Sequence, residues 1–169
     1  KEYCDDLPQE KDVTYGHGPD CIEQPAAEWP QHGVVEFRNA SLRYRDGLPL
    51  VLKNVSFTVA AGHKVGIVGR TGSGKSTVML ALFRMVELAE GSIFFDGTDI
   101  SKVKMHDLRK KITIIPQDPM LFQGTIRSNL DPFFQSTDEE VWEVLEKVNM
   151  GERVRRDSDG LNCVVAEKG

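Results

Sequence analysis

The hydrophobic and polar positions change character near residue 33, and from there they predict strands followed by helices. Apolar and polar residues alternate over Val34–Phe37, Leu42–Arg45 and Val51–Val59, as in half-buried β-strands. The nearly continuous apolar run Val65–Val68 predicts a short strand that is buried on both faces. These segments favour an antiparallel β element that leads into an α/β core.

Helices and further strands are expected beyond a glycine-rich stretch. From Lys75 to about Val86 the residues are apolar nearly all round, which predicts a buried helix. We expect a strand over Ser92–Asp96 that runs into a turn, a short helix over His106–Lys110, and a second buried strand over Ile112–Ile115.

Another helix is marked by its own start signal. Thr137–Glu140 matches a capping box. Apolar residues follow at helical spacing, which predicts an amphipathic helix with the stripe Val141, Val144, Leu145 and Val148.

Residues 1–32 have a different texture and predict a Pro-rich, acidic linker. Half of the eight prolines lie there, and proline disfavours both helix and sheet pairing. Trp29 is expected to anchor the end of this linker to the following domain. We therefore divide the chain into 1–32 and 33–169, and the latter into a core at 33–117 and a further segment at 118–169.

Composition narrows the class of protein. The 169 residues are 40% hydrophobic and 28% charged, a globular balance, with net charge −5. An acidic chain is a poor partner for nucleic acid, and no apolar run is long enough to insert into a membrane. The N-terminus lacks a secretory signal, and the three cysteines, Cys4, Cys21 and Cys163, form no CxxC pair, which favours a reducing compartment.

The chemistry is concentrated in Gly69–Ser76, which fits the P-loop pattern G-x-x-x-x-G-K-[ST] between a predicted strand and a predicted helix. Glycines allow backbone N–H groups to approach and wrap a phosphate chain. Lys75 would reach the β and γ phosphates, and Ser76 would offer a hydroxyl to Mg²⁺. The helix that follows would aim its N-terminus at the phosphates.

Two further residues are candidates for the same site. Tyr44 could stack its ring on a purine, although a lone tyrosine is also compatible with ordinary strand packing. Gln117 ends a predicted strand, where its side-chain oxygen could meet Mg²⁺ or an attacking water. A glutamine in a loop is equally compatible with simple solvation.

Several sequence stretches together resemble the nucleotide-binding domain of an ATP-binding cassette (ABC) transporter. The resemblance is strongest to the second such domain of the multidrug-resistance-associated (C) subfamily, and it runs from about Trp29 to the C-terminus. The motifs that carry it are Leu42–Arg45, Val65–Thr77, Asp107–Arg109, Ile114–Thr125 and Asn129–Phe133.

The resemblance implies a P-loop NTPase core of the ABC cassette type that binds ATP and Mg²⁺. It makes Tyr44 the aromatic that stacks on adenine, Val51 a neighbour of the base, and Gln117 the Q-loop glutamine that contacts Mg²⁺. Residues 118–149 would begin the helical subdomain. The implied Walker A loop comprises Gly69, Arg70, Thr71, Gly72, Ser73, Gly74, Lys75, Ser76 and Thr77.

Some motifs of that family have no counterpart here. Neither a signature sequence, nor a Walker B strand with its catalytic Glu, nor a switch histidine is found, and Ile93–Asp96 resembles Walker B only superficially because Gly97 follows it. We identify no catalytic residue, and expect a truncated cassette that binds nucleotide weakly, does not hydrolyse it and exposes an apolar sheet edge.

As a whole, the resemblance implies the ATP-binding portion of an exporter at the cytoplasmic face of a membrane. Its partners would be the transmembrane domains of the same polypeptide and a second nucleotide-binding domain. An ATP-sensing regulatory cassette of a channel or receptor-type member of the subfamily remains an alternative. A soluble P-loop kinase or GTPase is disfavoured, since the guanine-selecting Asn-Lys-x-Asp is missing.

Overall fold

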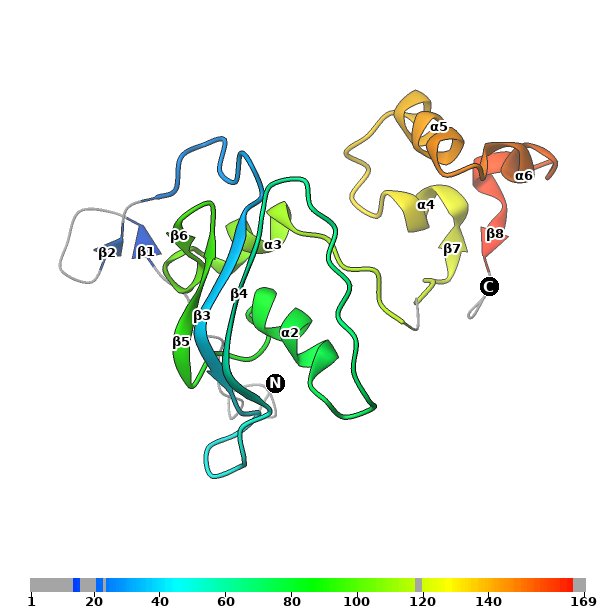
Figure 1. The fold of residues 1–169 in the computed structure, drawn as a ribbon. Coiled ribbons are helices and arrows are strands. Elements are labelled where there is room, and N and C mark those ends of the chain that lie inside the picture. Colours follow the sequence, from blue (N-terminus) through cyan, green and yellow to red (C-terminus); the bar gives the residue numbers. More distant parts are fainter. Residues whose placement is uncertain (1–13, 16–20, 23, 118–119, 166–169) are drawn as a thin grey trace, which may run out of the picture. The chain divides into compact units, whose positions relative to one another are not determined.

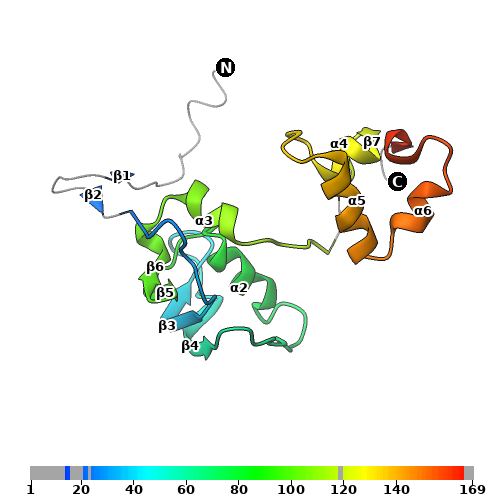
Figure 2. The ribbon, with the colours of Figure 1, turned by 90° about the horizontal axis from the view of Figure 1, so that it is seen from above.

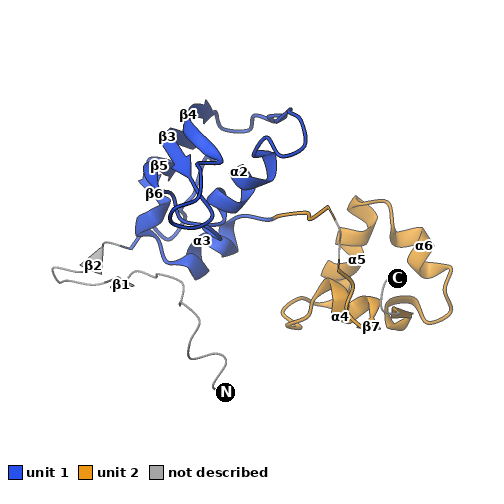
Figure 3. Cartoon of the chain, turned by 90° about the horizontal axis from the view of Figure 1, so that it is seen from below, with its two compact units in different colours: residues 1–113 blue, residues 114–169 orange. Residues whose placement is uncertain are grey.

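The structure is a computed structural model that describes residues 14–15, 21–22, 24–117 and 120–165. Its chain divides into two compact units, Lys1–Thr113 and Ile114–Gly169 (Figures 1 and 3). The mixed α/β architecture agrees with the predicted fold class. Each unit has its own small hydrophobic core, so the two are described separately.

Unit 1 is built around a four-stranded antiparallel sheet in the order β4-β3-β5-β6. Figure 2 shows β3, β4 and β5 side by side with helix α2 next to them. The elements are β3 (Val35–Leu42), β4 (Leu52–Val59), α2 (Lys75–Leu82), β5 (Glu90–Phe95), β6 (Thr98–Asp99), the 3-10 helix η1 (Ile100–Lys102) and α3 (Met105–Lys111).

Alternation along β3 explains where the core lies. Phe37 is opposite Phe57 on β4 and Ile93 on β5, and its ring stacks on that of Phe57 at 4.5 Å between centroids. The register shifts beyond Arg38, where Asn39 has a positive φ of 49°. Gly91 faces this bulge so closely that a Cβ there would lie 2.3 Å from the Asn39 carbonyl oxygen. Only glycine fits such an approach.

Helix α2 is shorter than the predicted segment up to Val86. It ends in a Schellman arrangement: Arg84 has φ 48°, its N–H donates to the Ala81 carbonyl, and the Met85 N–H donates to the Leu80 carbonyl. The face of α2 that carries Val78 and Ala81 packs into the same core as Leu42, Ile93 and Leu108.

The predicted anchor at Trp29 is present. Its ring is buried (6% exposed), and the indole N–H donates to the Phe95 carbonyl at 2.9 Å. Next to it, the Asp96 carboxylate accepts backbone N–H groups from His32, Gly33 and Val34 at 2.8, 3.2 and 2.7 Å. The segment that leads into β3 is thus held by hydrogen bonds to Phe95 and Asp96, where β5 ends and the β5–β6 turn begins.

The rest of the predicted linker is only partly described. Residues 1–13, 16–20 and 23 lie outside the described residues. Contrary to the expected absence of sheet pairing, strand β1 (Thr14–Tyr15) pairs in parallel with β2 (Cys21–Ile22). Neither strand contains a proline, so backbone donors are available there.

Unit 2 contains short helices around a second core. The expected capping box at Thr137 and Glu140 is confirmed, with the two reciprocal bonds at 3.3 and 2.8 Å, but Val144 and Val148 are exposed while Val141 and Leu145 are buried. The elements are β7 (Gly124–Thr125), α4 (Ile126–Leu130), α5 (Asp138–Lys147), α6 (Gly151–Arg155), the 3-10 helix η2 (Gly160–Asn162) and β8 (Val164–Val165).

Two predicted buried strands were wrong. Val65–Val68 and Ile112–Ile115 are not strands, and Val68 and Ile115 are 93% and 91% exposed. An apolar run becomes a buried strand only when neighbouring strands satisfy its backbone groups. Within the described part of the chain, no strand pairs with either segment. The apolar residues that we expected at an exposed sheet edge are therefore exposed in irregular chain instead.

Candidate nucleotide site

The glycine-rich loop before α2 adopts the backbone conformation that the P-loop motif requires. Gly72 and Gly74 have positive φ values of 80° and 88°, which residues with a Cβ rarely adopt. Gly74 is also the N-cap of α2 and provides no capping side chain. The first N–H groups of α2 are therefore left to other acceptors.

Steric contacts further explain why glycines stand at Gly69 and Gly74. A Cβ on Gly69 would lie 2.4 Å from Ser73 Oγ, so the loop closes on itself at that residue. A Cβ on Gly74 would lie 3.3 Å from Leu52 Cδ2 and 3.4 Å from the Val51 carbonyl oxygen. Leu52 was not a predicted site residue, because nothing in the sequence distinguishes it from an ordinary strand residue.

The ammonium group of Lys75 is held against its own loop. Its Nζ donates to the carbonyl oxygens of Gly69 and Arg70 at 2.8 and 2.9 Å. A lysine ammonium has three N–H donors, so these two bonds leave one for another acceptor. The positive charge thus lies on the loop whose backbone precedes the N-terminus of α2.

Tyr44 lies two residues beyond the end of β3 and not on a strand, contrary to prediction. Its side chain is 47% exposed, and its hydroxyl is 2.8 Å from Thr77 Oγ1. Thr77 belongs to the first turn of α2 and is buried. The aromatic ring is therefore tied to the helix that follows the loop.

These residues share one cavity of about 290 Å³. Its lining contains no carboxylate or imidazole; it consists of Tyr44, Val51, Gly72, Gly74, Lys75, Ser76 and Thr77. The four other predicted loop residues, Gly69, Arg70, Thr71 and Ser73, belong to the same turn but do not line it. The lining thus combines an aromatic and an aliphatic side chain with an ammonium, hydroxyls and the start of a helix.

The two predicted metal ligands lie in different units. Ser76 is in the first turn of α2, beside Lys75, and is exposed. Gln117 is in the irregular segment at the start of unit 2 and is also exposed. The hydroxyl of Ser76 is suited to a hard cation that keeps most of its water ligands, such as Mg²⁺. The described residues contain no cluster of three His, Cys, Asp or Glu side chains able to hold a metal.

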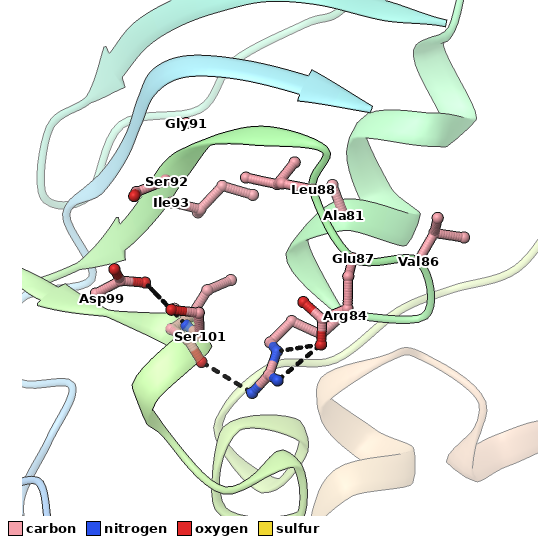
Figure 4. Close-up of a pocket in the computed structure, with 11 residues that line it drawn as sticks. Ala81, Arg84, Val86, Glu87, Leu88, Gly91, Ser92, Ile93, Asp99 and Ser101 are labelled. Atoms are coloured by element: carbon pink, nitrogen blue, oxygen red, sulfur yellow. Dashed lines mark hydrogen bonds and ion pairs between the residues drawn. The ribbon is translucent and has the colours of Figure 1, made fainter. Parts of the chain in front are cut away.

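Unit 1 has a second cavity, of about 120 Å³, below the end of α2 (Figure 4). Its polar groups already contact one another. The buried Arg84 guanidinium donates to the Ile100 and Val103 carbonyls at 3.1 and 2.8 Å and pairs with Glu87, while Asp99 caps Ser101. These bonds offset the strain of the positive φ at Arg84. The polar groups that line this cavity therefore stabilise the fold.

Comparison with known proteins agrees with this geometry. The model of the ABC transporter family matches residues 52–162, a stretch that includes the loop and α2. The chain belongs to the ABC transporter family. The rat protein "ATP-binding cassette sub-family C member 3" is 55% identical over 83% of this chain and 9% of its own length. "Multidrug resistance protein mrp-7" of Caenorhabditis elegans is 53% identical over 86% of this chain and 10% of its own.

A solved structure supports the fold. The chain of "Structure of a bacterial Atm1-family ABC exporter with ATP bound" aligns with a TM-score of 0.75 and 34% identity, over 82% of this ABC-family chain and 24% of that one. The resemblance to the C subfamily is confirmed, and the chain spans about a tenth of the length of the curated relatives it matches. No helix among the described residues is long and apolar enough to cross a membrane.

Proposed function

We propose that this chain binds Mg²⁺ and ATP as the nucleotide-binding portion of an ABC exporter of the C subfamily. The observation that carries the proposal is the cavity in which the positive-φ glycines, Lys75 and the start of α2 meet Tyr44. Some of its lining groups suit an anion, and others suit a flat apolar ring. A nucleoside triphosphate combines these two chemistries.

Phosphate recognition rests on the loop. The N–H groups at the start of α2 and the ammonium of Lys75 supply positive potential, and glycines keep side chains out of the way. Lys75 would bind the β and γ phosphates as a compact charge. Ser76 would bind Mg²⁺. The cation would neutralise phosphate charge.

The base would stack on Tyr44, with Val51 as its neighbour. A half-exposed aromatic ring gives a purine a π-face that is worth about 1–3 kcal/mol per base. Stacking is tolerant of base identity, so it contributes affinity rather than strict selection. The stack also sets the direction in which the triphosphate enters the loop.

Hydrolysis needs a group that orients and deprotonates water, and the lining of this cavity has none. We therefore propose that these 169 residues bind ATP without turning it over. In the full-length protein, we propose that the segment works at the cytoplasmic face of a membrane. There it would act with transmembrane domains and a second cassette. The name of a solved relative, an ABC exporter with ATP bound, supports the exporter role.

The test is calorimetric titration of the full-length protein with Mg-ATP, comparing wild type with Lys75→Ala. We expect saturable binding in wild type and at least about tenfold weaker binding in the variant, because a charge-assisted contact is lost. Lys53→Ala, an exposed change on β4 that removes the same charge, should bind like wild type. Binding that is absent in wild type, or equal in wild type and Lys75→Ala, would refute the proposed function.

A further inference from the structure

We propose that Thr77 is a positioning residue that fixes the ring of Tyr44 for the base, and so couples recognition of the base to the phosphate loop. This inference rests on the proposed function. It assigns to the Thr77 side chain a role toward Tyr44, whereas the family resemblance places Thr77 only among the residues of the phosphate loop. The carrying observation is the 2.8 Å contact between the two hydroxyl oxygens.

Thr77 is well suited to hold another group in place. Its side chain is 3% exposed, and it stands in the first turn of α2, where the next N–H, that of Val78, donates to the Gly74 carbonyl. In a helix a Thr side chain divides between two χ1 rotamers, and burial with the bond to Tyr44 selects one of them. The Thr77 hydroxyl therefore has a position that is determined by the backbone of the phosphate loop.

Tyr44 has the opposite properties. It lies in the loop between β3 and β4, whose ends are closed by the bond from the Val51 N–H to the Leu42 carbonyl at 2.8 Å. Almost half of its side chain is exposed, so packing alone restricts the ring weakly. The phenol oxygen at the tip of the ring is bonded to Thr77. This bond selects one ring orientation at the wall of the cavity.

The bond between Tyr44 and Thr77 therefore fixes the position of the Tyr44 ring relative to the phosphate loop. A ring that is already oriented loses less conformational freedom when a base stacks on it. Without the bond, Tyr44 would keep its stacking surface but would have to be ordered by the ligand. The effect should therefore be larger for ligands that have a base than for ligands that have only phosphates.

The test measures binding of Mg-ATP and of Mg-tripolyphosphate to the full-length protein by calorimetry. Thr77→Val, which has nearly the same shape, should weaken ATP binding about two- to twelvefold and weaken tripolyphosphate binding by a clearly smaller factor. Tyr44→Phe should give the same pattern, and the double variant should be no weaker than either single one, because all three remove one bond. Thr77→Ser should recover most of the loss.

Each other outcome overturns the inference. An equal loss for ATP and tripolyphosphate would make Thr77 a phosphate ligand, and additive losses in the double variant would make the two hydroxyls independent. Thr58→Val, an exposed Thr-to-Val change on β4, should alter neither affinity. If wild type binds neither ligand, the proposed function itself fails; if it binds both and Thr77→Val changes nothing, only the role of Thr77 fails.

Discussion

Asp96 offers the sharpest test of how the N-terminal segment is attached to unit 1. Its carboxylate accepts three backbone N–H groups from residues 32–34, and its own φ is 46°. Asn tolerates this left-handed conformation as well as Asp does. Asp96→Asn therefore removes the negative charge and leaves backbone strain and side-chain volume nearly unchanged. Because the three N–H groups bond to both carboxylate oxygens and an amide has only one acceptor oxygen, at least one of the three bonds is lost as well.

The magnitude follows from the three bonds. A hydrogen bond to a charged acceptor contributes about 1 kcal/mol more than one between neutral groups, and a bond that is lost entirely costs a similar amount or more, which gives about 3 kcal/mol for the three. The carboxylate is partly exposed, and solvent screening lowers this figure. We expect Asp96→Asn to reduce the free energy of unfolding of unit 1 by about 1–2 kcal/mol at pH 7.

The dependence on pH has a definite sign. Desolvation raises the pKa of Asp96, but the hydrogen bonds from the backbone N–H groups of His32, Val34 and Gly33 outweigh it and hold that pKa below its ordinary value. A depressed pKa in the folded state stabilises the fold above about pH 4, and this contribution is lost as the pH falls through the folded value. The difference between wild type and Asp96→Asn should therefore shrink in acid.

The assay uses urea unfolding followed by tryptophan fluorescence. The chain has two tryptophans, and replacing Trp142 with Phe leaves Trp29, which lies beside the altered site, as the reporter for unit 1. Asp46→Asn, in an exposed turn, is the matched control and should change stability by less than about 0.5 kcal/mol. Equal stability of Asp96→Asn and wild type at pH 7 would refute the role of the carboxylate.

Two further substitutions each test one local contact, one in unit 2 and one in unit 1. Thr137→Ala removes the capping box of α5 and should destabilise unit 2 by about 1 kcal/mol, read from Trp142 fluorescence in urea; a Trp29→Phe background isolates that signal. Trp29→Phe itself removes the donor to the Phe95 carbonyl and should cost unit 1 about 1–3 kcal/mol in circular dichroism melts. An unchanged urea transition for Thr137→Ala, or unchanged melting for Trp29→Phe, would contradict the assigned contact.

Local signals predicted much of the fold. The capping box at Thr137 and the alternation around Phe37 each depend only on residues that are close in the sequence. The structure has a helix and a strand there. The Gly72 and Gly74 conformations follow from the loop motif in the same way. Predictions of this kind depend on a few adjacent positions and a known geometry.

Features that depend on distant partners were not predictable. Val65–Val68 reads as a buried strand, yet pairing decides whether it forms, and pairing is not encoded within the segment itself. The early end of α2 depends on Arg84, whose positive φ is supported by the carbonyls of Ile100 and Val103 sixteen and nineteen residues away. The Tyr44–Thr77 bond likewise joins two residues that look ordinary on their own.

The bonds from Lys75 to its own loop affect how a ligand is received. Two N–H groups of the ammonium already hold the carbonyls of Gly69 and Arg70, so the long side chain is immobilised during folding. An arriving anion meets a cation that is already in place and gives up little additional rotational freedom to it. A lysine without these two bonds would have to be ordered by the ligand itself, and that ordering would offset part of the binding free energy.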